Sequence, residues 1–370
     1  MQEFYSYDAN MPNGEMRVTD GAYSGSGAPV SGPFVPPSNL PESHVWKQDL
    51  RRLSRAGGGA LLLFCALQLA LVIMLHLLEN PAALLVKRFL PGVDANTAEL
   101  FWNGFASVLM GLLVIMPGVL LGLRLLSPED NNISLPFRRP ANHPPVSKAT
   151  IMKVVIAGAF LCLMGNFAAT IFSSIANMLG YDFVAPENPA SETTAGLLFM
   201  TFASAVMPGI CEELLMRGMI MQPLRRYGDR FALVASALLF AILHQNMVQA
   251  PMAFCAGLAL GWATMKTGTL WAAIFIHIWN NAVSTILLAL EKPLGDSANY
   301  VFWLYVPLLA MAGMFCLISL ARESGGGPPK VKHPLSAGTR AINYFFGSPA
   351  MGVALIYLFY MLARGIQATA

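Results

Sequence analysis

Two adjacent carboxylates and an arginine occur in a part of the chain that is otherwise apolar enough for a lipid bilayer. The stretch reads Cys211-Glu212-Glu213-Leu214-Leu215-Met216-Arg217, and the run 201–210 before it holds no charge. An ionised side chain at the centre of a membrane helix costs about 2.5–3.5 kcal/mol on translocon-based scales. Such a costly cluster indicates a functional site at membrane depth.

The spacing of these three residues divides their tasks. Glu213 and Arg217 stand four residues apart, so they share a helix face and can form an ion pair. Glu212 points about 100° away from Glu213 and stays available for another partner. Two neighbouring carboxylates in a low-dielectric site do not both ionise easily, and a carboxylate that can take up a proton is what general-base catalysis requires. Pro208-Gly209 can kink the helix just before the pair and make room for water.

Two more polar pairs follow at the same helical spacing. Phe240 and His244 share one face, and His277 and Asn281 share another, with Asn280 beside them. Together the three pairs supply a base, two imidazoles and an amide, which can activate a water molecule and stabilise an oxyanion. The same inventory can hold a divalent metal ion with an open position for water.

Each pair also has a purely structural explanation. Glu213 and Arg217 can be a helix-packing ion pair, His244 an interfacial histidine, and Asn281 an interhelical hydrogen-bonding residue. Phe240 is more simply a packing residue. The coincidence of three such pairs on three different apolar segments favours chemistry. His76 has no polar partner four residues away, and we expect no function for it.

The composition is that of a membrane protein. Of 370 residues, 55% are hydrophobic and 12% charged, with a mean hydropathy of +0.56, whereas soluble domains carry about 25% charged residues. The net charge of +3 is too small to suggest a nucleic-acid partner. We predict an all-α fold, a polytopic transmembrane helix bundle of about eight to nine spans. The candidate segments are 58–78, 100–123, 151–179, 194–221, 231–246, 250–265, 270–290, 300–320 and 348–362.

Loop composition predicts the topology and the domain organisation. Lysine and arginine concentrate in alternate loops, which favours a cytoplasmic N-terminus. Residues 1–45 are rich in Gly, Pro, Ser and Asn and are expected to be a disordered cytoplasmic tail without a cleavable signal peptide. The remaining parts are N-terminal transmembrane helices (46–190), a core that carries the three polar pairs (191–292) and C-terminal transmembrane helices (293–370).

The three motifs in this order resemble a known family. Glu-Glu-x-x-x-Arg at 212–217, Phe-x-x-x-His at 240–244 and His-x-x-x-Asn at 277–281 are similar to the motifs of the CPBP intramembrane endopeptidases. This is the CAAX-processing and bacteriocin-processing group, also called Abi or Rce1-like. The resemblance covers about 194–290. The ordered triple is specific, whereas each motif alone is weak.

The resemblance implies a role for each motif residue. Glu212 would be the general base and activate water together with His244, while His277 and Asn281 would stabilise the oxyanion. Glu213 and Arg217 would support Glu212. Members of the family are described both as metalloproteases and as glutamate-based enzymes. We therefore expect either no cofactor or a divalent metal such as zinc, with Glu212, His244 and His277 as the candidate ligands.

The expected partners are a peptide or membrane-protein substrate and the lipid bilayer, in a bacterial inner membrane. Two other functions fit the residues less well. A proton- or ion-coupled transporter would use the carboxylates and Arg217 as a relay, but the matched broken helices of such proteins are not evident. An inactive scaffold or immunity protein would not need the intact motifs. Convergence of the motif residues on one cavity open to the cytoplasm is the expectation that separates the protease from both.

Overall fold

The computed structural model describes residues 4–6, 17–19, 42–89, 95–127, 132, 134–140, 143–184, 193–323 and 338–368. The chain divides into two compact units, Met1–Val35 and Pro36–Ala370. In the first unit, β1 (Phe4–Ser6) pairs antiparallel with β2 (Arg17–Thr19). The other residues of the predicted tail, up to 41, lie outside the described ranges, and their disorder stays a prediction.

The second unit is built almost entirely of helices, as predicted. Its α-helices are α1 (Glu42–Phe89), α2 (Ala95–Leu109), α3 (Met116–Leu125), α5 (Lys148–Met178), α6 (Thr194–Thr201), α7 (Met207–Glu213), α8 (Gln222–Leu224), α9 (Asp229–Leu243), α10 (Ala250–Thr267), α11 (Leu270–Leu294), α12 (Ala298–Glu323), α13 (Gly338–Phe346) and α14 (Pro349–Ala363). Three π-helices interrupt them: η1 (Met110–Ile115), η2 (Phe202–Val206) and η3 (Leu214–Met221). Two 3₁₀ turns are η4 (Arg225–Tyr227) and η5 (Gly295–Ser297), and β3 (Tyr181–Phe183) pairs antiparallel with β4 (Ile366–Ala368).

Each of the nine apolar segments is helical over most of its length, but the predicted number of spans is not confirmed. Within the described ranges, six helical runs are long and apolar enough to cross a membrane, and α9, α10 and α14 are not among them. For α9 the reason is length, since 15 residues make about 22 Å of helix at 1.5 Å per residue, against a hydrocarbon core about 30 Å thick. α10 has 18 residues, but glycines, threonines and Lys266 make it less apolar than the six candidate spans. The protein is therefore an integral membrane protein in which α9 and α10 form a short hairpin.

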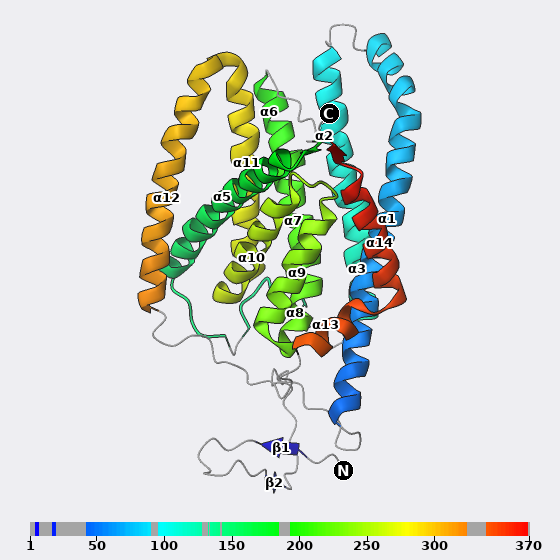
Figure 1. Ribbon diagram of the computed structural model, residues 1–370, viewed down its shortest axis with the longest axis vertical. Coiled ribbons are helices and arrows are strands. Elements are labelled where there is room, and N and C mark those ends of the chain that lie inside the picture. The colour runs from blue at the N-terminus through cyan, green and yellow to red at the C-terminus, as the bar shows by residue number, and fades with distance from the viewer. Residues whose placement is uncertain are drawn as a thin grey trace. The chain divides into compact units, whose positions relative to one another are not determined.

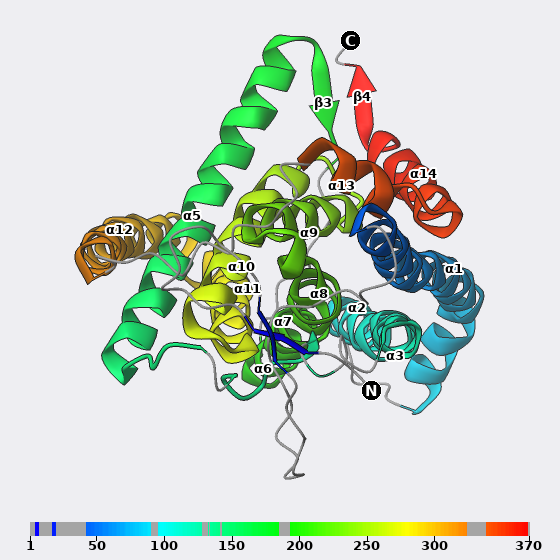
Figure 2. The ribbon, with the colours of Figure 1, turned by 90° about the horizontal axis from the view of Figure 1, so that it is seen from below.

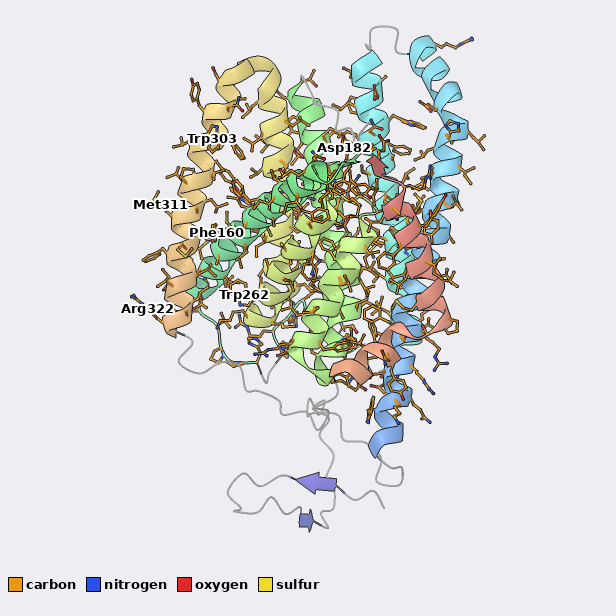
Figure 3. All side chains as sticks on the ribbon, in the orientation of Figure 1. Phe160, Asp182, Trp262, Trp303, Met311 and Arg322 are labelled. Atoms are coloured by element: carbon orange, nitrogen blue, oxygen red, sulfur yellow. The ribbon has the colours of Figure 1, made fainter. Side chains whose placement is uncertain are left out.

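The helices around α7 form the centre of the bundle (Figure 1). Seen along the bundle, α7, α9, α10 and α11 lie between α1, α3 and α14 on one side and α5 and α12 on the other (Figure 2). The outer helices turn large side chains away from the bundle, as Trp303 and Met311 of α12 do (Figure 3). Both are 64% exposed, and in a bilayer such side chains contact lipid.

Polar contacts join helix ends at one end of the bundle. Lys153 near the start of α5 pairs with Glu323 at the end of α12, and Arg226 lies 3.5 Å from Asp49 near the start of α1. The helix ends that make these contacts border the loops in which the sequence concentrates basic residues. Their gathering at one end (Figure 1) is what a common side of the membrane requires.

Small residues allow the central helices to approach closely, as is common between membrane helices. A β-carbon on Gly257 of α10 would lie 2.8 Å from the Cα of Ala237 on α9.

We expect Gly257→Ala to lower the free energy of unfolding by about 1–3 kcal/mol, because α9 and α10 must move apart to accept the methyl group. Unfolding in detergent measures the effect. The control is Gly352→Ala on α14, where a β-carbon meets nothing within 4 Å; equal stability losses in both variants would contradict the prediction.

Candidate functional site

The two glutamates end a short α-helix that lies between two π-helices. η2 precedes α7 and η3 follows it, and Pro208 stands in the first turn of α7. The predicted distortion before the glutamates is therefore present, as a change of helix type. Gly209 lets α7 approach α11, since a β-carbon there would lie 2.6 Å from Cγ1 of Ile278. π-Helical turns occur frequently at functional sites.

Glu213 is the centre of the buried polar network. Arg217 Nη1 donates to its Oε1 at 2.7 Å, and His277 Nδ1 donates to the same oxygen at 2.8 Å. Glu213 and Arg217 are both 0% exposed. The ion pair expected from the spacing is confirmed, and the structure adds a histidine from α11 to it.

Glu212 faces the other nitrogen of the same histidine. Its Oε2 lies 3.9 Å from Nε2 of His277, and its side chain is 17% exposed. Among the described residues this buried oxygen has no hydrogen-bond partner, and neither has Oε2 of Glu213. His277 is therefore placed between two carboxylates, each with an oxygen still able to accept a hydrogen bond.

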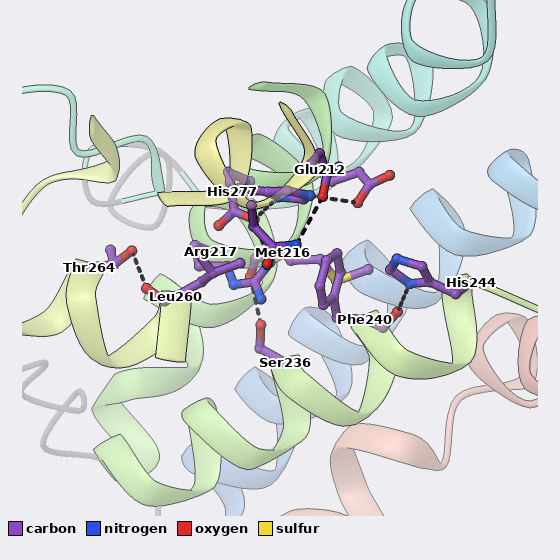
Figure 4. A network of polar contacts seen from close by, with 12 residues as sticks. Glu212, Met216, Arg217, Ser236, Phe240, His244, Leu260, Thr264 and His277 are labelled. Carbon is purple, nitrogen blue, oxygen red and sulfur yellow. Dashed lines mark hydrogen bonds and ion pairs between the residues drawn. The ribbon is translucent and has the colours of Figure 1, made fainter. Parts of the chain in front are cut away.

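Phe240 separates and orients the basic groups of the site (Figure 4). The Arg217 guanidinium carbon lies 4.2 Å from the centre of the Phe240 ring, which is a cation–π distance. The same ring packs edge-to-face against His244 at 4.7 Å and against His277 at 5.7 Å between centroids. Phe240 is a packing residue, as expected, but its packing partners are three of the candidate catalytic side chains.

His244 lies at the end of α9, and a hydrogen bond fixes its ring. Nδ1 lies 2.8 Å from the carbonyl oxygen of Phe240. Because a carbonyl can only accept, Nδ1 carries the hydrogen, and in the neutral ring Nε2 has the lone pair. Glu212 has its ion-pair contact with His277 among the described residues, and the expected cooperation of Glu212 with His244 on a water molecule stays a prediction.

The amide of Asn281 is held at both of its ends. Nδ2 donates to the carbonyl of Ser204 in η2 at 3.1 Å, and Oδ1 accepts from Asn280 Nδ2 at 3.2 Å. One Nδ2 hydrogen remains. An amide fixed in this way can donate to a developing negative charge with little reorganisation.

A small cavity connects these groups. It offers about 20 Å³ of space and is lined by residues of α5, α9, α10 and α11, among them His244, His277, Asn280, Asn281 and Cys162. About 10–15 Å³ with several polar partners is enough for one water molecule. Two imidazoles and the Asn281 amide thus converge on a space of water size, next to the His277–glutamate contacts.

The candidate metal ligands do not come together as a set of three. No group of three or more His, Cys, Asp or Glu side chains among the described residues is arranged to hold a metal ion. Zinc enzymes use three protein ligands besides water, and here Nδ1 of His277 is already bonded to Glu213. Metal dependence stays a prediction, which the effect of a chelator on peptide cleavage would test.

Sequence reasoning missed several residues around the site. Cys162 comes from α5, which no motif marks, and Ser204 contacts the site through its backbone carbonyl. Asn280 was only noted as polar, although it bonds Asn281 and lines the cavity. Gln68 of α1, a glutamine in an apolar span, was not singled out. A single amide in an apolar span is a signal of a hydrogen bond to another helix.

Comparison with known proteins identifies the central part of the chain. Residues 194–283 match the family model described as type II CAAX prenyl endopeptidase Rce1-like. Searches of curated proteins and of solved structures found no match. The matched segment contains Glu212, Glu213, Arg217, His244, His277 and Asn281. This central segment is therefore similar to the Rce1-like type II CAAX prenyl endopeptidases.

Proposed function

We propose that this protein is an endopeptidase that hydrolyses a peptide bond of a membrane-associated substrate within the bilayer. The observation that carries the proposal is the contact of Glu212 and Glu213 with His277, beside a cavity of water size that His244, His277 and Asn281 line. The match to an Rce1-like protease family supports it. With the basic end of the bundle on the cytoplasmic side, the N-terminus is cytoplasmic as well.

The proposed reaction uses only groups of the chain and one water molecule. Glu212 takes one proton from the water as the water oxygen adds to the scissile carbonyl carbon, and Nε2 of His244 accepts a hydrogen bond from the other O–H of that water. The oxyanion of the tetrahedral intermediate accepts hydrogen bonds from Nδ2 of Asn281 and from Nε2 of doubly protonated His277. The carbon–nitrogen bond then breaks, and the proton passes to the departing amine.

Glu213 and Arg217 prepare the site without touching the substrate. Glu213 accepts from Nδ1 of His277 and so sets the ring orientation that leaves Nε2 toward Glu212. Arg217 compensates the charge of Glu213 in a fully buried position. This division supports the assignment of Glu212 as the residue that exchanges protons, because its side chain is 17% exposed and its Oε2 has no hydrogen-bond partner among the described residues.

The test is peptide cleavage by the full chain in proteoliposomes, measured by mass spectrometry. Two membrane-anchored reporters are used, a prenylated C-terminal CAAX peptide and an unprenylated transmembrane peptide. We expect Glu212→Ala and His244→Ala each to reduce cleavage by at least about 100-fold, since a positioned acid–base group contributes about 10²–10⁴-fold. His76→Ala is the matched histidine control, because its side chain is 84% exposed and its ion-pair contact is with Glu79 on the same helix. Undiminished cleavage by both site variants would overturn the catalytic assignment.

A further inference from the structure

A pair of glutamines joins α1 to the residue that follows His244. Gln245 Nε2 donates to Oε1 of Gln68 at 2.5 Å, and Gln68 Nε2 donates to Oε1 of Gln245 at 3.2 Å. Gln68 lies within the membrane-spanning part of α1, Trp46–Glu79. This helix is outside the segment 194–283 that matches the family. A part of the chain with no family motif therefore contacts the site next to one of its histidines.

Gln245 has a backbone conformation that normally belongs to glycine. Its φ is +53°, and among the described residues it is the one non-glycine residue with a positive φ. It occupies the position just after the C-cap of α9, where a left-handed residue ends many helices and is usually Gly. A residue with a β-carbon is strained there and persists only when its surroundings hold it. The two hydrogen bonds to Gln68 are the side-chain contacts that hold Gln245.

The turn at Gln245 decides how His244 is bonded. The backbone N–H of His244 donates to Ala241 O at 3.3 Å, and that of Gln245 donates to Ile242 O at 3.1 Å. These contacts span three residues rather than the four of an α-helix, so the last turn is tightened. The Phe240 carbonyl, which a continuing helix would bond to the N–H of residue 244, instead accepts from the His244 ring at 2.8 Å.

We propose that Gln68 is a positioning residue for His244. It holds Gln245 in the left-handed turn, the turn leaves the Phe240 carbonyl to the imidazole, and this hydrogen bond fixes Nδ1 as the protonated nitrogen. Nε2 then keeps its lone pair for the cavity that His244 lines. The consequence for hydrolysis rests on the proposed function, whereas the consequence for the ring of His244 does not.

Anchoring of α1 to the bundle is the plainer role for such an amide pair. The start of α1 is already attached to the central helices by another contact, in which Asp49 accepts a hydrogen bond from Tyr227 and faces Arg226. An anchor would act on the whole helix and would not depend on the conformation of Gln245. A positioning residue acts only through the left-handed conformation of Gln245, so its effect should disappear when residue 245 is glycine.

The experiment is a double-mutant cycle on the full chain, with kcat and KM measured on the cleaved reporter peptide. Gln68→Met keeps the side-chain volume and removes both hydrogen bonds. We expect it to lower kcat by about 10- to 100-fold with little change in KM, the cost of misplacing a catalytic group by about 1 Å. Glycine adopts the left-handed turn without support from Gln68, so Gln245→Gly should lower kcat less than Gln68→Met does. Adding Gln68→Met to Gln245→Gly should then lower kcat by less than about threefold.

Leu69→Ala is the control for a change on the same turn of α1, since Leu69 is 49% exposed, and it should leave kcat unchanged. An equal loss from Gln68→Met in the parent and in the Gln245→Gly background would overturn the proposal in favour of an anchor. If Gln68→Met does not fold, Gln68→Asn, which keeps an amide but shortens it, replaces it in the same cycle.

A second readout separates this inference from the proposed function. The ¹⁵N spectrum of histidine-labelled protein in nanodiscs reports which ring nitrogen of His244 carries the proton, and a His244→Gln variant assigns the signal. The parent should show the Nδ1–H tautomer, and Gln68→Met should show a mixture. An unchanged tautomer in Gln68→Met would overturn the positioning role even if the protein cleaves peptides. A shifted tautomer in a protein that cleaves neither reporter would support the positioning role while the protease proposal fails.

Discussion

Glu212→Gln is expected to lower kcat for peptide cleavage by about 10²–10⁴-fold with KM nearly unchanged, the range that a general acid–base group contributes. Glutamine has the shape of glutamate but cannot take a proton from water. The carboxylate has no hydrogen-bond partner at Oε2 among the described residues, so the change leaves no buried partner unpaired. Reporter cleavage in proteoliposomes, followed over a range of substrate concentrations, separates kcat from KM.

Glu79→Gln is the matched control for removing one carboxylate, because the Glu79 side chain is 64% exposed and its ion pair within the described residues is with His76. It should cleave at the parental rate. A Glu212→Gln variant that keeps kcat and raises KM would show that Glu212 binds the substrate and does not exchange protons. The base would then have to be sought at His244.

Arg217→Met is expected to lower the free energy of unfolding by about 3–5 kcal/mol, because it leaves the fully buried Glu213 carboxylate without its arginine and with only His277 as a partner among the described residues. The pair is 0% exposed on both sides, and its Nη1–Oε1 distance is 2.7 Å. The substitution also removes the cation from the Phe240 ring, where it lies 4.2 Å from the centroid. Denaturant-induced unfolding in mild detergent measures the loss.

Two further variants isolate the cause of that loss. Arg225 and Asp229 have the same spacing of four residues and the same 2.7 Å distance, but their side chains are 28% and 42% exposed. Arg225→Met should therefore cost no more than about 1 kcal/mol. Combining Arg217→Met with Glu213→Gln should recover most of the stability, since no unpaired charge remains, yet not the activity, because His277 loses its carboxylate partner. If Arg217→Met and Arg225→Met destabilise equally, burial is not what gives the Glu213–Arg217 pair its importance.

The sequence was sufficient for the helical class and for the membrane setting, for a direct physical reason. Apolar segments such as 270–290 and 300–320 can satisfy their backbone hydrogen bonds in lipid only by forming helices. It was also sufficient for the Glu213–Arg217 pair, because a spacing of four residues fixes the relative direction of two side chains on one helix. Both predictions depend on local geometry that residues close in the sequence determine by themselves.

The partners that come from other helices could not be predicted in this way. Periodicity gives the face on which His277 lies but not the helix it meets, so only the packing of α11 on α7 shows that His277 binds Glu213 and faces Glu212. The predicted span count is not confirmed, because hydropathy marks α9 and α10 as apolar without showing that they pack as a short hairpin. Gln68 shows the same limit most plainly. Its contact with Gln245 joins positions far apart in the chain, and packing of distant segments, which no local pattern encodes, decides it.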